Sequence, residues 1–287
     1  MKNFLLILAA VVIALGVRNF VLPQKAATVA PAESAYDRVI RTRVLHCAYA
    51  VYPPFLGKDP NSGKLSGIMP DVMDAFAQAS GLKVEWGPEV DWGAIAATLQ
   101  AGKADAFCAG MYITPQRGLV IADSTPIYFG VLNAYARTDD KRFDDNLDAM
   151  NRPDVSMSVN MGDASEEVSK RLFPQAQLVY RSLTGGEAEL FLNVANHKAD
   201  LTLSGPNNLS TFNQSNPDMA LRQVPLEHPL MVFPSVISVD IHEQMLRSLL
   251  NVTLHSLIDS GEVDRILRAD TGEDYGVSYF PAKSQLN

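Results

Sequence analysis

The sequence predicts an α/β protein that consists of two similar halves, each with a mainly parallel sheet. Two observations lead to this prediction. Short apolar segments of strand type alternate with segments whose apolar residues recur at helical spacing, and this alternation occurs twice along the chain. The 287 residues, of which 47% are hydrophobic and 20% charged, are also enough for two modest domains.

The first half contains three predicted strands separated by two predicted helices. The strand segments are short and apolar, and the helical segments end at Gly81 and Gly102, since glycine is typical of helix C-termini. We predict strands at 44–49, 82–86 and 104–109 and helices at 70–80 and 92–101. Right-handed crossovers in this order place the loops that leave the strands along one edge, where open α/β sheets bind ligands.

The second half repeats this order and is followed by further helices. Leu246, Leu250 and Leu254 share one helical face near the end of the chain, as expected for a helix that packs on a core. We predict strands at 155–159, 178–180 and 201–203 and helices at 162–172, 187–196, 244–258 and around Val263–Leu267. Two sheets of similar build predict two lobes that face each other across a cleft.

The N-terminus has the features of an export segment. Lys2 precedes an apolar run from Phe4 to Val17, the order found in signal peptides. The longer stretch 4–22 also reaches the roughly 17–25 residues that a membrane-spanning helix needs. We therefore expect an N-terminal apolar helix within 1–24, either a cleaved signal peptide or a retained anchor, followed by an Ala/Pro-rich linker at 25–35. Both alternatives place the rest of the chain outside the cytoplasm.

Charge and cysteine content argue against two kinds of partner. The net charge of −8 disfavours nucleic acid, whose binding requires a basic patch. Two cysteines without clustered histidines disfavour a metal site, and we expect no cofactor. Cys47 and Cys108 each lie in a predicted buried strand, so we expect unpaired core residues, although the compartment permits a disulfide.

A set of short motifs follows one another in a fixed order along the chain. The motifs are Tyr52-Pro53-Pro54-Phe55, Gly63-Lys64-Leu65-Ser66-Gly67, Pro70-Asp71-Val72, Asp91-Trp92, Leu99-Gln100-Ala101-Gly102-Lys103-Ala104-Asp105-Ala106, Ala109-Gly110-Met111 and Thr114-Pro115-Gln116-Arg117. The ordered set resembles the family 3 periplasmic solute-binding proteins, the polar amino-acid receptors of ABC importers with the type II periplasmic-binding fold. The similarity runs from about Tyr36 to about Leu267.

This resemblance implies a ligand site on the first lobe. In the family, the Arg of the Thr-Pro-x-Arg segment binds the ligand carboxylate, and Arg117 occupies that position. Tyr52 and Trp92 fall where the family stacks aromatic rings on the ligand, Gly110 would let the backbone approach it, and Tyr112 would supply a hydroxyl. The structural alternatives are a surface arginine that caps a helix, aromatic residues in the core, and a plain turn glycine.

The second lobe is expected to contribute backbone donors at a helix N-terminus. Gly162, Asp163, Ala164 and Ser165 lie where the family has a Gly-Thr-Thr-x-Glu loop, but Asp163 and Ala164 replace its hydroxyl residues. An acid beside a ligand carboxylate is repulsive, so we expect Asp163 to point away while the N–H groups bind; Asp163 could also serve only as a helix cap. Ser204 is a further expected site residue.

One departure concerns the ligand's ammonium group. Amino-acid receptors of the family carry an Asp five residues after the Asp of the Lys-Ala-Asp segment, and counting from Asp200 this position is Gly205. A buried ammonium without a partner costs several kcal/mol. Either the ligand is a carboxylate without an α-ammonium, which we favour, or the ammonium contacts Asp163, Asp91 or carbonyl groups.

The resemblance implies a monomeric, non-enzymatic protein of the periplasm. It would capture a small carboxylate ligand, an amino acid or related organic acid, and deliver it to an ABC-transporter permease in the inner membrane. We place lobe 1 at 36–128 and 230–287 and lobe 2 at 129–229, with hinge strands near 127–131 and 225–230.

Two other functions remain open. A membrane-anchored sensor or receptor of the same fold is favoured by the long apolar N-terminal stretch. A dehydratase-like enzyme is disfavoured, because such catalysis needs an acidic residue and the expected position holds Gly205.

Overall fold

The computed structural model describes residues 33–182, 186–271 and 279–281, and from Ser34 onward they belong to one compact unit. The predicted signal peptide or anchor at 1–24 and most of the predicted linker lie outside these residues. Among the residues that are described, no helix has both the length and the apolar character needed to cross a bilayer.

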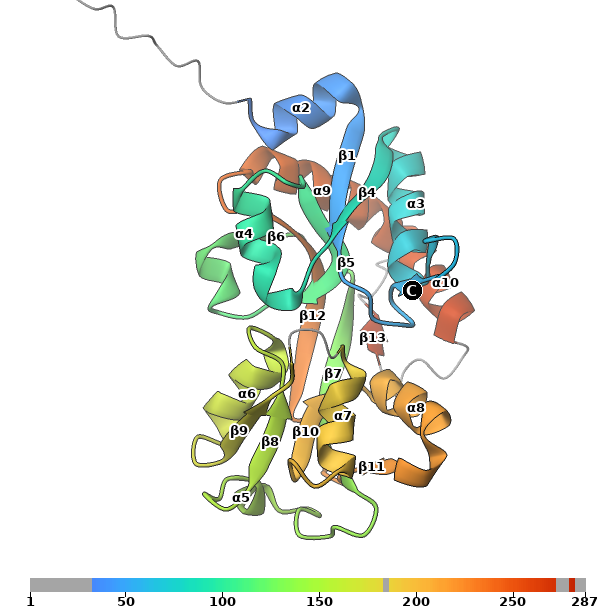
Figure 1. The fold of residues 1–287 in the computed structure, drawn as a ribbon. Coiled ribbons are helices and arrows are strands. Elements are labelled where there is room, and N and C mark those ends of the chain that lie inside the picture. The colour runs from blue at the N-terminus through green and yellow to red at the C-terminus, as the bar shows by residue number, and fades with distance from the viewer. Residues whose placement is uncertain (1–32, 183–185, 272–278, 282–287) are drawn as a thin grey trace, which may run out of the picture. The chain divides into compact units, whose positions relative to one another are not determined.

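One continuous path of paired strands runs through both halves (Figure 1). Its order is β4-β1-β5-β12-β7-β10-β8-β9. The bounds are β1 Val44–Tyr49, β4 Lys83–Glu89, β5 Ala106–Tyr112, β7 Tyr128–Arg137, β8 Ser156–Val159, β9 Gln177–Tyr180, β10 Leu201–Ser204 and β12 Met231–Asp240. Strand β1 is parallel to β4 and β5, and β8 is parallel to β9 and β10. The predicted α/β class is confirmed.

Strands β7 and β12 join the two halves. They are antiparallel, and their pairing from Tyr128 to Leu132 and from Met231 to Ser235 forms the crossing. The first predicted hinge strand corresponds to the start of β7, but the second was placed too early, because 225–230 precedes β12. Two prolines in that segment, Pro225 and Pro229, lack the N–H groups that a strand ladder requires.

Short strands extend this framework. They are β2 Gly57–Lys58, β3 Leu65–Ser66, β6 Ile121–Asp123, β11 Leu221–Gln223 and β13 Tyr279–Pro281. Strand β13 pairs with β7 at the crossing, so the C-terminal part of the chain lies beside the connection between the halves.

The predicted helices are present with small shifts in their ends, and α2, α5 and α8 are additional. Helix α3 shows the physical basis, since its apolar residues Val72, Met73 and Phe76 are buried and it ends at Gly81 in the left-handed conformation, φ 66°. The helices are α2 Ala35–Thr42, α3 Ile68–Ser80, α4 Ile95–Gln100, α5 Leu147–Met150, α6 Ala164–Leu172, α7 Ala188–Ala195, α8 Pro206–Ser215, α9 Gln244–Asp259 and α10 Glu262–Thr271, with 3₁₀ helices η1 Trp92–Ala94, η2 Arg117–Leu119 and η3 Pro217–Met219.

The largest core draws residues from both ends of the chain. Leu45 and Phe76 pack in one cluster with Ile237, Leu254 and Leu267, and α9 and α10 both contact α3. A second core comes only from the middle of the chain, between Leu132 and Phe233. Each half therefore has its own buried apolar core.

A disulfide bond joins Cys47 on β1 to Cys108 on β5, with their Cα atoms 5.5 Å apart. The expectation of two unpaired core cysteines was wrong. Strands β1 and β5 are adjacent and parallel, and Cys47 pairs with Ala106 in their register. This register brings the two thiols together, and it depends on tertiary pairing that the local sequence does not specify.

Candidate ligand-binding site

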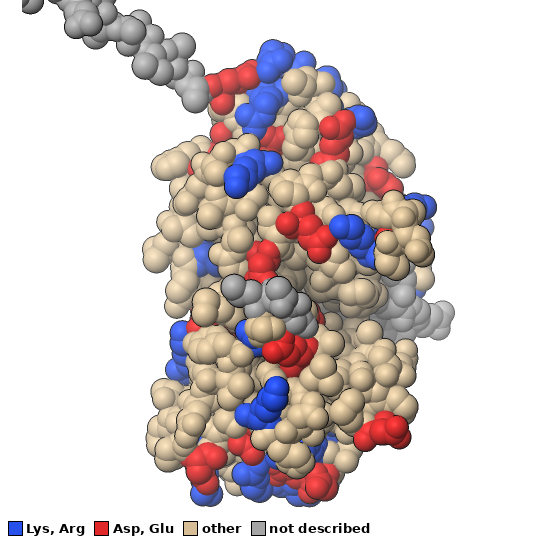
Figure 2. Space-filling view, viewed as in Figure 1, with Lys and Arg blue, Asp and Glu red and all other residues tan. Residues whose placement is uncertain are grey.

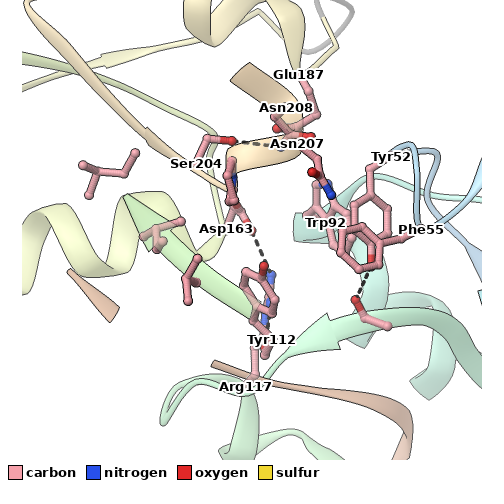
Figure 3. Close-up of a pocket in the computed structure, with 16 residues that line it drawn as sticks. Tyr52, Phe55, Trp92, Tyr112, Arg117, Asp163, Glu187, Ser204, Asn207 and Asn208 are labelled. Atoms are coloured by element: carbon pink, nitrogen blue, oxygen red, sulfur yellow. Dashed lines mark hydrogen bonds and ion pairs between the residues drawn. The ribbon is translucent and has the colours of Figure 1, made fainter. Parts of the chain in front are cut away.

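A cavity lies between the two halves, against the inner part of β7 (Figure 3). About 60 Å³ of its volume is accessible to water. The lining residues are Tyr52, Phe55, Trp92, Gly110, Tyr112, Arg117, Val131, Leu132, Asp163, Glu187, Leu203, Ser204, Gly205, Pro206, Asn207 and Asn208. Its charged and amide side chains come from segments that follow strands β5, β8, β9 and β10, the edge predicted to bind ligands.

Aromatic rings form the wall contributed by the first half. Tyr52 stacks on Phe55 with ring centroids 5.0 Å apart and meets Trp92 edge-on at the same distance. The Tyr52 hydroxyl lies 2.6 Å from the carbonyl oxygen of Ala109 and 2.7 Å from that of Gly110, so it donates to this backbone. Tyr52 and Trp92 thus pack against their neighbours and also border the cavity.

Gly110 brings the backbone to the cavity surface because no side chain fits there. Its φ is 81°, and an added Cβ would lie 2.8 Å from both Ser235 Oγ and Tyr128 Oη. Two residues later the Tyr112 ring stacks on Phe233 with centroids 5.0 Å apart. These contacts set one end of the cavity.

Arg117 lies in the cavity and contacts both halves. Its Nη1 donates to the Tyr112 carbonyl at 3.0 Å, and its Nη2 donates to the Gly162 carbonyl at 2.9 Å. Nη2 also lies 3.9 Å from Asp163 Oδ1, and the arginine side chain is only 11% exposed. The alternative of a surface arginine is therefore excluded. A guanidinium has five N–H donors, and these two hydrogen bonds leave it able to bind a carboxylate.

The first backbone N–H groups of the loop before α6 donate to residues of this loop and of α6 itself. The Gly162 N–H donates to Glu166 at 2.7 Å, and the Asp163 N–H donates to the Asn160 carbonyl at 3.1 Å. The buried Ser165 hydroxyl donates to Asp163 Oδ2 at 3.2 Å.

Of the predicted residues in this loop, only Asp163 lines the cavity, whereas Gly162, Ala164 and Ser165 do not. The expectation that Asp163 points away was wrong, because the positive charge of Arg117 attracts its carboxylate. Ser204 lines the cavity as predicted and accepts a hydrogen bond from the Asn208 amide at 2.8 Å. Whether any of these residues binds a ligand stays a prediction.

Glu187 is a cavity residue that sequence reasoning missed. It lies just before α7, and the Asn160 amide donates to its Oε1 at 3.4 Å. Burial, followed by the negative charges of Asp163 and Asp91, raises the pKa of its carboxyl to about 7, while Arg181 and a Trp92 hydrogen bond oppose this. Phe55, Asn207 and Asn208 were also missed, although the two asparagines lie only four and five residues after the end of the strand predicted at 201–203, which is a usable signal.

Further contacts join the halves beside the cavity. Arg181 Nη2 donates to Asp91 Oδ2 at 2.8 Å. Gly162 approaches Gly93 so closely that an added Cβ would lie 3.0 Å from the Gly93 Cα. The structure thus has the two halves in contact around the cavity.

Comparisons with known proteins agree with this geometry. The family model of the bacterial extracellular solute-binding proteins, family 3, matches residues 45–269. None of the curated protein sequences compared with the chain matches it.

The surface charge is mixed. On the face shown in Figure 2, the described residues carry acidic and basic side chains close together rather than one broad basic patch.

Solved structures have the same fold. An ancestral amino acid-binding protein, described as a precursor of cyclohexadienyl dehydratase, is 25% identical with TM-score 0.70, covering 83% of this chain and 99% of that one. An ancestral arginine-binding protein bound to glutamine is 25% identical with TM-score 0.68, covering 80% and 98%. A Streptococcus pneumoniae amino acid ABC transporter substrate-binding protein bound to L-arginine, 20% identical with TM-score 0.68 and covering 82% and 97%, shares the fold. The chain therefore belongs to the bacterial extracellular solute-binding proteins of family 3, as the motifs predicted.

Proposed function

We propose that this protein captures a small carboxylate-bearing ligand, an amino acid or related organic acid, between its two halves and delivers it to an ABC permease. Family membership and the amino-acid-binding proteins among its structural relatives support this role. The observation that carries it is the position of Arg117, a largely buried guanidinium in a cavity between the halves, with hydrogen bonds to both. The proposed location is the periplasm, and the proposed form is a monomer.

The proposed capture has two steps. The ligand first docks on lobe 1, at 36–128 and 230–287, where Arg117 binds its carboxylate and the aromatic wall covers it. Lobe 2, at 129–229, then closes and brings the Asp163 loop and Ser204 to the ligand. Strands β7 and β12 act as the hinge. The ligand shifts the population towards the closed form only by the extra contacts it makes there.

The test is a binding measurement on Arg117→Ala. A thermal-shift screen of amino acids and organic acids first identifies a ligand, because binding to the native state raises the melting temperature. Calorimetry on the variant is expected to show a loss of affinity of about 30-fold or more, since removing one partner of a desolvated charge pair costs at least about 2 kcal/mol. Arg152→Ala, an exposed arginine paired with Asp154, is the matched control and should bind normally.

Unchanged affinity in Arg117→Ala would remove this residue from the site. The ligand is also recovered and weighed by mass spectrometry after incubation. An unchanged mass is expected from a binding protein, whereas loss of water would favour a dehydratase-like enzyme.

A further inference from the structure

The charges around the cavity do not balance. Asp163 lies 3.9 Å from Arg117, and Asp91 lies 2.8 Å from Arg181, so each of these acids has a cation beside it. Glu187 is a third acid, and it lines the same cavity. With Glu187 ionised, these five side chains carry two positive and three negative charges. The cavity region therefore has one negative charge in excess.

Among the described residues, the groups hydrogen-bonded to the Glu187 carboxyl are neutral, and the cation that acts on it is shared with another acid. Asn160 donates through its amide, and Trp92 is hydrogen-bonded to the Glu187 side chain. Arg181, the cation that acts on Glu187, already pairs with Asp91. An enclosed carboxylate in this situation favours either a proton or an additional cation.

The excess negative charge distinguishes between ligand classes. A ligand with only a carboxylate would add another negative charge beside Asp163 and Glu187, and like charges at short range repel. A ligand that also carries a cationic group would supply the charge that the cavity lacks. Tyr52, Phe55 and Trp92 line the same space, and the faces of aromatic rings attract cations.

Gly205 also bears on how a cationic group of the ligand could be bound. It lines the cavity at the N-terminus of α8 and has no side chain that could pair with such a group. An acid is nevertheless present in the same cavity, because Glu187 at the start of α7 reaches it from a neighbouring element. The missing carboxylate at Gly205 is thus matched by one from another part of lobe 2.

We propose that Glu187 is the counter-ion for a cationic group of the ligand, an amine or a guanidinium, while Arg117 binds the ligand carboxylate. The ligand then spans the cavity between the two charged side chains. This inference rests on the proposed function and replaces the expectation of a carboxylate without an ammonium. It makes Glu187 the specificity-determining residue that separates ligands with a cationic group from carboxylates without one.

The experiment compares matched ligand pairs on wild type and Glu187→Gln. The common amino acids and matching carboxylates that carry no cationic group, such as L-glutamine with 4-carbamoylbutanoate and L-leucine with 4-methylpentanoate, are screened by thermal shift, and the binders are titrated by calorimetry. Wild type is expected to prefer the more cationic member of the best pair at least 10-fold. Glu187→Gln is expected to lower that ratio at least 10-fold.

Controls separate this role from a structural one. Glu262→Gln, an acid on the surface of α10 paired with Arg265, should leave the ratio unchanged, and Glu187→Asp should restore part of it. If a carboxylate that carries no cationic group is the best ligand, or if Glu187→Gln keeps the wild-type ratio, the inference is overturned and the proposed function stands. If no carboxylate compound binds wild type, the proposed function itself fails, and the inference with it.

Discussion

Arg181 and Asp91 form an ion pair between the two halves, with Arg181 Nη2 2.8 Å from Asp91 Oδ2. The arginine side chain is 5% exposed and the aspartate 40% exposed, so the pair lies at the rim of the contact between the halves. Arg181 follows β9 and Asp91 precedes η1, and a separation of the halves would break the pair. In the proposed capture, the pair therefore contributes only to the closed form.

Asp91→Asn is expected to weaken ligand binding about 5-fold by destabilising the closed form. The half-exposed acid limits the effect to about 1 kcal/mol, and asparagine keeps the ability to cap η1. Calorimetry gives the affinity, and small-angle scattering gives the fraction of open molecules. Asp154→Asn, in an exposed pair within one half, should change neither. Equal scattering profiles for wild type and Asp91→Asn would contradict the expectation.

Glu187→Gln is expected to stabilise the ligand-free protein at pH 8. The pKa of Glu187 is raised to about 7 in the folded protein, so the folded state holds a proton that the unfolded state has lost between roughly pH 4.5 and 7. The free energy of unfolding of wild type therefore falls as pH rises through this window. The free energy of unfolding of Glu187→Gln does not fall in this way, because glutamine does not titrate. The resulting difference from wild type amounts to about 1–3 kcal/mol above pH 7.

Thermal unfolding of both proteins at pH 5 and pH 8 measures this effect. The gap in melting temperature between variant and wild type should be wider at pH 8 than at pH 5. A variant that is relatively less stable at pH 8 would mean that the carboxylate is better stabilised than its surroundings indicate.

Removing the disulfide is expected to lower the free energy of unfolding by about 2–4 kcal/mol, because the bond closes a loop in the unfolded chain. The two cysteines are 61 residues apart in sequence. Urea unfolding of Cys47→Ala/Cys108→Ala measures the change. A reducing agent should lower the midpoint of wild type and leave the double variant unaffected. A wild-type midpoint that is insensitive to reduction would argue against the bond.

Gly110→Ala is expected to reduce both stability and ligand affinity. The left-handed backbone costs a non-glycine residue about 1–2 kcal/mol, and the new Cβ would push against Ser235 and Tyr128. Gly118→Ala is the control, since an added Cβ there meets nothing within 4 Å. Urea unfolding and calorimetry together check both effects; a Gly110→Ala protein with wild-type values would show that the loop adapts freely.

Much of the fold followed from local patterns. Helix α3 was predicted because its apolar residues repeat at helical spacing and Gly81 ends it. Helix α8 was missed because its sequence is mostly polar and only Phe212 is buried. Strand β12 was misplaced, because it contains Pro234 and is stabilised by pairing with β5 and β7 on both sides. Pairing between distant segments leaves little trace in a single segment of sequence.

The residues of the candidate site were likewise predicted only in part. Arg117 was predicted because it lies in a recognisable motif, and the cavity contains it. Glu187 was missed, because an acid at the start of a helix is common for reasons of the helix dipole alone. Its enclosure depends on Asp163, Trp92 and Asn160, which come from three other segments of the chain.

The origin of the two cores has a consequence for the order in which the protein is made. A ribosome that releases the chain from its N-terminus completes the core between Leu132 and Phe233 before Leu254 and Leu267 exist. Leu45 and Phe76 are synthesised first, but they become buried only after these last helices have been made and have packed on them. The middle of the chain can therefore fold first, while the half that precedes and follows it in sequence is still incomplete. A nonsense codon shortly after Asp240 would keep every residue of the core between Leu132 and Phe233. The other core would lack α9 and α10, which complete it.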